Sequence, residues 1–381
     1  MSEPSELRRR IVDVIRRDSP IPFSRYMEMC LYEPGLGYYA RPREHFGKAG
    51  DFYTASDIHA VYGRLLCRQF EEMWRALGSP KQIDLLELGP GRGLFMLDVL
   101  DWAAKKFPAF ADALHIRAVE TSEWLRDRLR ERLGKYIARE RVTIHLTIAD
   151  AEPKLGHVLL VFANEFFDAL PVDILSHEGE IRIALDDQDR LVEVTAPARP
   201  ELLDYLDQYS IHPDEGMRTE INLAGLHYME QIAGLFADRR GFAMLVDYGY
   251  TREQQQAGRH IDTLMTYRQH QAGGNPYEAP GEQDITAHVN FTALRAVAEN
   301  HRLDYLGLLT QSQFLIGIGA TNEFADAFED TAIPQERAKV ALQLKHLVTP
   351  AGIGEIFQVL VLGRGVPADA ARALNGMKFA R

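Results

Sequence analysis

The chain has 381 residues, 46% of them hydrophobic, which is enough to bury one large core or two smaller ones. Its formal net charge is -12 and no stretch is densely basic, so a nucleic-acid partner is disfavoured. No apolar run approaches the roughly 18 residues that a membrane-spanning helix needs. The only cysteines, Cys30 and Cys67, rule out a disulfide framework and a Cys-rich zinc site, and no metal site is predicted.

The N-terminal stretch is rich in arginine, as mitochondrial transit peptides are. It also carries Glu3, Glu6, Asp13 and Asp18, whereas transit peptides are poor in acids. Apolar residues recur at helical spacing over residues 7–15, which predicts a first amphipathic helix of the mature fold. We therefore expect a cytoplasmic protein of bacterial type.

The next part of the chain alternates between strand and helix patterns. Strands are predicted over residues 83–88, 116–119, 142–148 and 158–163, and helices over residues 95–104 and 124–133. The last of these strands is so continuously apolar that it is typical of the buried centre of a parallel sheet. This rhythm predicts a doubly wound α/β fold.

After Pro171 the pattern changes to short alternating runs joined by polar turns, which predicts an inserted β-meander. The runs cover residues 172–176, 180–185 and 191–195, a helix is expected over residues 222–236, and a buried strand resumes at residues 242–246 and ends in Asp247-Tyr248-Gly249. Residues 269–284 are so rich in Gly and Pro that we expect no regular element there, and we predict that they form a mobile lid. Residues 303–309 and 356–362 are predicted to close the sheet as an antiparallel pair, with a largely helical segment between them.

These patterns divide the chain into six segments. The predicted segments are 1–80, a helical segment expected to cover the ligand site described next; 81–171, the first part of the core; 172–238, the inserted meander and helices; 239–310, the second part of the core with the lid at 269–284; 311–349, a helical insertion; and 350–381, the final strand and tail.

A glycine-rich turn follows the first predicted strand. Residues 87–93 read Glu-Leu-Gly-Pro-Gly-Arg-Gly, at the carboxyl end of a strand and before a helix, which is where open α/β sheets bind ligands. Gly89, Gly91 and Gly93 are spaced G-x-G-x-G, which fits an amino-acid carboxylate and a ribose better than the pyrophosphate that a G-x-G-x-x-G loop holds. An ordinary βα turn is the alternative.

Acidic residues follow the second and third predicted strands. Glu120 is placed to accept hydrogen bonds from ribose hydroxyls, as an acid does in nicotinamide enzymes too. Asp150 is predicted to contact an adenine amino group, although a turn-capping role is nearly as well supported. The loop at residues 50–56, with Phe52 and Thr54, is a candidate cover for the cofactor.

Two more acids, Glu165 and Asp168, directly follow the fourth strand, at the same rim as the glycine turn. Helix capping would explain them, since acids are favoured at helix N-termini. The functional interpretation is that they bind, orient or deprotonate a nucleophile.

The sequence resembles the MidA-like methyltransferases along almost its whole length. The matching motifs are Pro22-Phe23-Ser24 with Tyr26-Met27, residues 34–39, Gly50-Asp51-Phe52 with Thr54, residues 87–93, residues 164–172, Asp247-Tyr248-Gly249, residues 284–289, and Gly354-Glu355 with Phe357. Residues 56–59 depart from the family's usual Ser-Pro-Glu-Ile-Ser, and Asn164 replaces a His of the mitochondrial relative.

The resemblance implies a class I Rossmann-like methyltransferase core, the cofactor S-adenosylmethionine and, as acceptor, an arginine of a protein partner such as a respiratory complex I subunit. Glu165, Asp168 or Asp247 would hold the guanidinium, and Glu87 and Asn164 would join the glycines and Glu120 at the cofactor. An NAD-dependent oxidoreductase and a non-catalytic assembly chaperone that keeps the pocket remain as alternatives.

Overall fold

The computed structural model describes residues 5–43, 60–260, 262–268, 271–329, 331 and 333–380. The chain forms two compact units. The sheet unit takes its residues from Tyr53–Phe166, Met229–Tyr248 and Val297–Arg381, and the meander unit takes its residues from Met1–Phe52, Phe167–Tyr228 and Gly249–Ala296. No helix in the described ranges is both long and apolar enough to cross a membrane.

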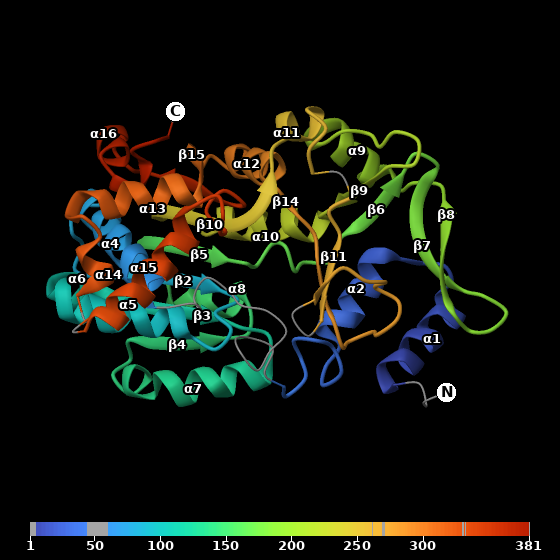
Figure 1. Cartoon of the computed structure of the whole chain (residues 1–381), viewed down its shortest axis with the longest axis horizontal. Helices are drawn as coiled ribbons and strands as arrows, with labels where there is room; N and C mark the ends of the chain where they lie inside the picture. The colour runs from blue at the N-terminus through green and yellow to red at the C-terminus, as the bar shows by residue number, and fades with distance from the viewer. Residues whose placement is uncertain are drawn as a thin grey trace. The chain divides into compact units, whose positions relative to one another are not determined.

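The sheet unit is built on a mainly parallel sheet with the strand order β15-β16-β10-β5-β2-β3-β4. Strands β10, β5, β2, β3 and β4 pair in parallel, and β16 runs antiparallel between β10 and β15. Figure 1 shows β10, β5, β2, β3 and β4 stacked in this order. The predicted doubly wound fold and its antiparallel closing pair are confirmed.

The strands of this sheet are β2 (Ile83–Leu88), β3 (Leu114–Val119), β4 (Val142–His145), β5 (Val158–Asn164), β10 (Arg240–Tyr250), β15 (Asp304–Thr310) and β16 (Phe357–Arg364). The helices of the unit are α4 (Ala60–Ala76), α5 (Leu94–Lys106), α6 (Pro108–Ala113), α7 (Glu123–Ile137), α8 (Ile148–Ala151), α13 (Gln311–Gly319), α14 (Ala325–Phe328), α15 (Pro334–Val348) and α16 (Ala368–Arg372), with short 3-10 turns η2 (Glu152–Lys154), η3 (Ala320–Asn322) and η4 (Asn375–Met377). Helices α10 (Leu223–Gly234) and α12 (Phe291–Asn300) continue from one unit into the other.

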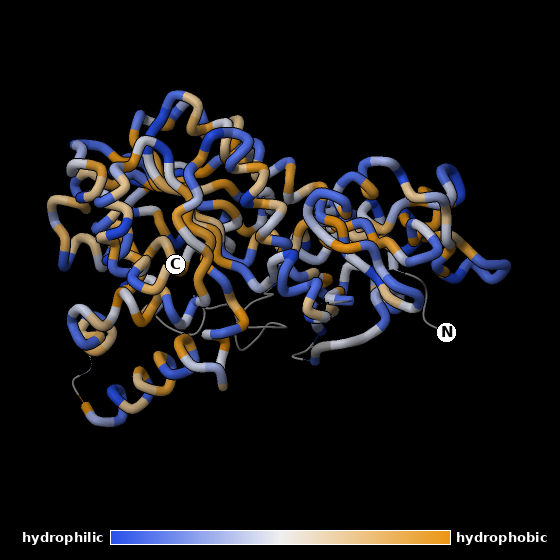
Figure 2. Tube along the Cα trace, turned by 90° about the horizontal axis from the view of Figure 1, so that it is seen from above, coloured by the Kyte–Doolittle hydropathy of each residue, from blue (hydrophilic) through white to orange (hydrophobic). Residues whose placement is uncertain are grey.

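The central strands are buried on both faces, which explains their continuous apolar runs. Figure 2 shows hydrophobic residues gathered in the middle of this unit. The predicted third strand is too long at its carboxyl end, because β4 stops at His145 and Thr147 begins helix α8 as its N-cap. Asp247-Tyr248-Gly249 lies inside β10 rather than after it.

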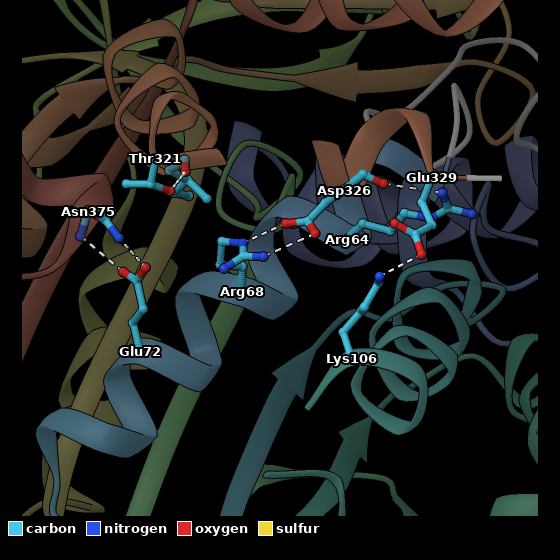
Figure 3. Close-up of polar contacts among 9 residues, drawn as sticks. Arg64, Arg68, Glu72, Lys106, Thr321, Asp326, Glu329 and Asn375 are labelled. Atoms are coloured by element: carbon cyan, nitrogen blue, oxygen red, sulfur yellow. Dashed lines mark hydrogen bonds and ion pairs between the residues drawn. The ribbon is translucent and has the colours of Figure 1, made fainter. Parts of the chain in front are cut away.

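Helix α4 is fastened at several points to the C-terminal part of the unit (Figure 3). Arg68 forms a two-point ion pair with the buried Asp326 of α14, at 2.5 and 3.1 Å. One turn further along, the carboxylate of Glu72 accepts hydrogen bonds from the backbone and side-chain amides of Asn375. These contacts fix the position of a helix whose first turn lies near the site described below.

The meander unit has its own antiparallel sheet, in which β1 (Ile21–Pro22), β7 (Gly179–Leu185), β6 (Asp173–Ser176) and β9 (Arg218–Ile221) are ordered and β8 (Leu191–Ala196) pairs with β7. Helices α1 (Glu6–Asp18) and α2 (Phe23–Tyr32) pack their apolar faces into the core of this unit. It also contains α9 (Pro200–Tyr209), α11 (Arg252–Gln256) and β14 (Val289–Asn290), which pairs with the end of β10. The N-terminal residues thus belong to the core of the predicted meander insertion.

The segment predicted as a lid is more regular than expected. Strand β11 (Met265–Arg268) pairs with β12 (Gln271–Ala272) on one side and β13 (Asp284–Thr286) on the other. The expectation that residues 269–284 hold no regular element is therefore wrong at Gln271–Ala272 and at Asp284. Backbone pairing with a neighbouring strand does not depend on side chains, so the Gly and Pro content could not reveal it.

Candidate functional site

The glycine turn lies between β2 and α5, at the carboxyl edge of the sheet. Gly89, Gly91 and Gly93 have φ of +62°, +53° and +72°, a left-handed conformation that glycine adopts without strain. A Cβ atom at Gly89 would also come within 2.9 Å of the Phe166 ring. Because Gly93 caps a helix of 13 residues, the N–H groups of the first turn of α5 and the positive end of the helix dipole lie beside the glycine turn.

Two buried carboxyl groups, Glu87 and Glu120, flank this turn. Glu87 is in β2 and 4% exposed, and its Oε2 atom has no hydrogen-bond partner among the residues that the structure describes. Burial and the nearby charge of Glu120 raise the pKa of Glu87 to about 8. Glu87 therefore has an unused acceptor inside the protein, where leaving one unpaired is costly.

Glu120 directly follows β3 and is 6% exposed. Its Oε1 atom accepts a hydrogen bond of 2.9 Å from the backbone N–H of Ser122, the N-cap of α7. Burial raises the pKa of Glu120 to about 7, and hydrogen bonds from the backbones of Ser122 and Gly91 limit the rise. Glu87 and Glu120 together suit a ligand that brings positive charge and hydrogen-bond donors.

Asn164 is the last residue of β5, and Glu165 directly follows it at the same edge. The Tyr62 hydroxyl donates a hydrogen bond of 2.7 Å to Asn164 Oδ1, and Asn164 Nδ2 donates one of 3.0 Å to Glu165 Oε1. Glu165 has a φ of +50°, which is rare for a residue with a side chain and is found where the surroundings enforce it.

Asp247 in β10 holds the backbone beside Glu165. Its two carboxylate oxygens accept the N–H groups of Phe166 and Tyr248, at 3.2 and 3.0 Å. Burial raises the pKa of Tyr62 well above its ordinary value, and the charges of Glu165, Glu87 and Asp247 raise it further. These groups therefore lie in one electrostatic environment. The structure thus brings Glu87, Glu165 and Asp247 together with a tyrosine that the sequence pattern did not single out, because an aromatic residue in a helix is more often part of the core.

Asp168 belongs to the meander unit, where it is 5% exposed and its carbonyl oxygen accepts the N–H of Ala287 at 3.0 Å. Its charge, with that of Asp284, acts on the buried Tyr39, whose hydroxyl donates to the Asp284 carboxylate at 2.9 Å. Within its unit, Asp168 therefore lies in a buried cluster of acids and tyrosines.

The remaining predicted residues have different outcomes. Asp150 does not end a strand: it is in the first turn of α8, where its side chain and that of Thr147 cap each other's backbone N–H groups at 3.1 Å. This is the capping role that the sequence left open, and a contact of Asp150 to adenine stays a prediction. Phe52 and Thr54 lie outside the described residues.

Comparison with known proteins identifies related chains. The family model described as "Putative S-adenosyl-L-methionine-dependent methyltransferase" matches residues 65–309. The mitochondrial protein arginine methyltransferase NDUFAF7 homolog of Drosophila melanogaster is 29% identical, over 92% of this chain and 83% of its own length. The human protein of that name is 26% identical, over 95% of this chain and 85% of its own length. A Burkholderia thailandensis protein crystallised with S-adenosyl-homocysteine is 29% identical, with a TM-score of 0.83 covering 100% of this chain and 98% of that chain.

Proposed function

Because the chain belongs to this family of S-adenosylmethionine-dependent methyltransferases, we propose that it transfers the methyl group to an arginine side chain of a protein partner. The observation that carries the proposal is the carboxylate of Glu165, held by Asn164 at the sheet edge where the glycine turn lies. Several relatives at 25–29% identity are named protein arginine methyltransferases, which supports this acceptor.

The residues of the sheet unit fit the cofactor. S-adenosylmethionine carries an ammonium group, a sulfonium group and two ribose hydroxyls, and the site offers the unused Oε2 atom of Glu87 and the buried carboxyl group of Glu120. The N–H groups of Gly89, Gly91 and Gly93 bond to Val119, Glu120 and Pro90, so the contribution of these glycines is a backbone without side chains that a ligand can approach closely. We assign Glu87 to the positive charge of the methionine part and Glu120 to the ribose hydroxyls.

When bound, S-adenosylmethionine supplies an electrophilic methyl group. Glu165 binds the N–H groups of the acceptor guanidinium and orients one nitrogen for in-line attack, which accounts for much of the rate enhancement in such reactions. In the transfer a nitrogen–carbon bond forms, the sulfur–carbon bond breaks, and the nitrogen loses one proton, which the Glu165 carboxylate accepts. Asp247 keeps the backbone of residues 165–166 in place through its bond to the N–H of Phe166.

For the acceptor protein we propose a subunit of respiratory complex I. The support is the resemblance of the sequence motifs to the MidA-like methyltransferases, which extends over almost the whole chain. The net charge of -12 also favours the approach of a cationic arginine-bearing segment.

The test is mass spectrometry of the host proteome with and without the gene, followed by transfer with the purified chain and deuterium-labelled cofactor. A methylarginine that disappears on deletion, and is restored by the purified chain, is the expected result. Loss of methylation at another residue type would overturn the arginine acceptor. If the Glu165→Gln variant, expressed in the deletion host, restores the assembly of complex I without any methylation, the chaperone alternative is correct.

A further inference from the structure

We propose that Tyr62 is a positioning residue for methyl transfer, which acts through Asn164 to hold the Glu165 carboxylate in its working orientation. The proposal rests on the function proposed above and adds to it a residue of α4 that lies outside the glycine turn and the strand ends. Tyr62 is 1% exposed, so it reaches the acceptor only through its neighbours.

Two hydrogen bonds of fixed direction connect Tyr62 to Glu165. The Tyr62 hydroxyl donates to Asn164 Oδ1 at 2.7 Å, and Asn164 Nδ2 in turn donates to Glu165 Oε1 at 3.0 Å. An asparagine amide can sit either way round, and its partners decide which end faces which group. A donor on the Oδ1 side leaves the NH2 end facing Glu165, whereas the flipped amide would set two oxygens against each other.

The Tyr62 hydroxyl is suited to be a permanent donor. Burial, together with the negative charges of Glu165, Glu87 and Asp247, raises its pKa well above the ordinary value of a tyrosine. The hydroxyl therefore stays protonated at neutral pH, where it acts as a hydrogen-bond donor. Its contribution is to orient Asn164.

The backbone of Glu165 is held by contacts that do not involve its side chain. The N–H of Glu165 donates to the carbonyl of Val246 at 2.9 Å, the next N–H bonds to Asp247, and φ is fixed at +50°. A strained backbone of this kind persists only where the surrounding structure determines it. Asn164 adds the constraint on the carboxylate itself.

Helix α4 presents Tyr62 from a rigid base. Beyond its first turn, Arg68 is paired with Asp326, Gln69 Oε1 accepts the backbone N–H of Gly376 at 2.8 Å, and Glu72 is bonded to Asn375, as Figure 3 shows for the first and last of these. The Tyr62 ring also packs against Phe95 at a centroid distance of 5.9 Å. Replacing tyrosine by phenylalanine keeps this packing and removes only the hydroxyl.

The first measurement needs no acceptor. In a crystal structure of Tyr62→Phe with S-adenosylhomocysteine bound, we expect the Asn164 amide and the Glu165 carboxylate to leave the positions they hold in the parent protein. An unchanged Asn164 and Glu165 would overturn the proposal, whichever residue the enzyme methylates.

The second measurement is a double-mutant cycle on methyl transfer to the identified acceptor. Tyr62→Phe should lower kcat by about twofold to tenfold, the range expected for losing a hydrogen bond between neutral groups, while the Kd of S-adenosylmethionine stays at the parent value. In the Glu165→Gln background the same change should have little further effect. Equal losses of kcat in both backgrounds would show that Tyr62 does not act through Glu165.

The matched control is Tyr136→Phe, which removes a hydroxyl that donates to the Asp101 carboxylate of α5. Tyr136 is in the last turn of α7, at the opposite end of that helix from Glu120. We expect parent kcat and Kd for this variant. A parent enzyme that methylates no arginine would refute the proposed acceptor and leave the Tyr62 question to the crystal structure, so the two failures are distinguishable.

Discussion

The buried acids of the cofactor site make a quantitative prediction: binding of S-adenosylmethionine weakens as pH falls below about 8. Burial and the charge of Glu120 raise the pKa of Glu87 to about 8, and burial raises that of Glu120 to about 7. A cationic ligand interacts best with the ionised carboxylates and so lowers both pKa values in the complex. Binding then releases protons from these carboxyl groups, and the sulfonium, whose charge does not titrate, is bound most tightly when both carboxyl groups are ionised.

The size of the effect follows from the pKa of free Glu87. With a value of about 8, the group is about nine-tenths ionised at pH 9 and about one-tenth ionised at pH 7. The ionised fraction of Glu87 alone therefore gives a fall in affinity of about tenfold, or about 1.4 kcal/mol, over these two pH units. Glu120, which is about half ionised at pH 7, adds about a further twofold loss by pH 7 and more below it.

Isothermal titration calorimetry in buffers of different ionisation enthalpy gives both the Kd and the number of protons released. We expect up to about one proton released near pH 7 to 7.5, most of which is lost in Glu87→Gln. The control Asp127→Asn, an exposed acid of α7, should keep the parent profile. A Kd that does not change between pH 9 and pH 7, with no proton release, would refute the assignment of Glu87 to the cofactor.

Three further predictions concern the site and the stability of the units. Glu165→Gln should raise the barrier to methyl transfer by about 2–4 kcal/mol with an unchanged cofactor Kd, measured by single-turnover kinetics and calorimetry; a parent rate would make Glu165 a structural residue. Gly89→Ala should lower the free energy of unfolding, measured in urea, by about 1–3 kcal/mol, because φ is +62° and the new Cβ would meet Phe166 at 2.9 Å. The control Gly134→Ala has open space on helix α7 and should raise the free energy of unfolding by up to about 1 kcal/mol. Burial lowers the pKa of His288 from 6.5 to about 4, so its contribution to stability is fully present above about pH 6.5 and is lost as pH falls toward 4, by on the order of 3 kcal/mol; His288→Gln should flatten this dependence in urea titrations.

Patterns within about ten residues were enough to predict the framework. Strand β2 occupies Ile83–Leu88, as its apolar run indicates, and the glycine spacing after it predicts a turn that the structure shows with three left-handed glycines. The exception, β4, ends early because Thr147 and Asp150 cap α8. A Thr-x-x-Asp pattern is a local signal too, but here it follows an alternating run that is equally typical of a strand.

Contacts between distant segments could not be predicted in this way. Ile21 pairs with Ile183, and Arg68 with Asp326, although no periodicity connects these positions. The segments of the meander unit are separated by parts of the sheet unit along the chain, and a pattern within one segment does not reveal the partner against which it packs.

The sequence by itself therefore determined the doubly wound sheet, the glycine turn and the acids at the strand ends, because hydrophobic periodicity and turn chemistry are local properties of the chain. The tertiary structure decided which of these acids are perturbed and which residue orients them. Burial beside Glu120 sets the raised pKa of Glu87, and the hydrogen bond from Tyr62 to Asn164 joins positions 102 residues apart. Desolvation and hydrogen-bond direction depend on neighbours in space, which exist only once the chain has folded.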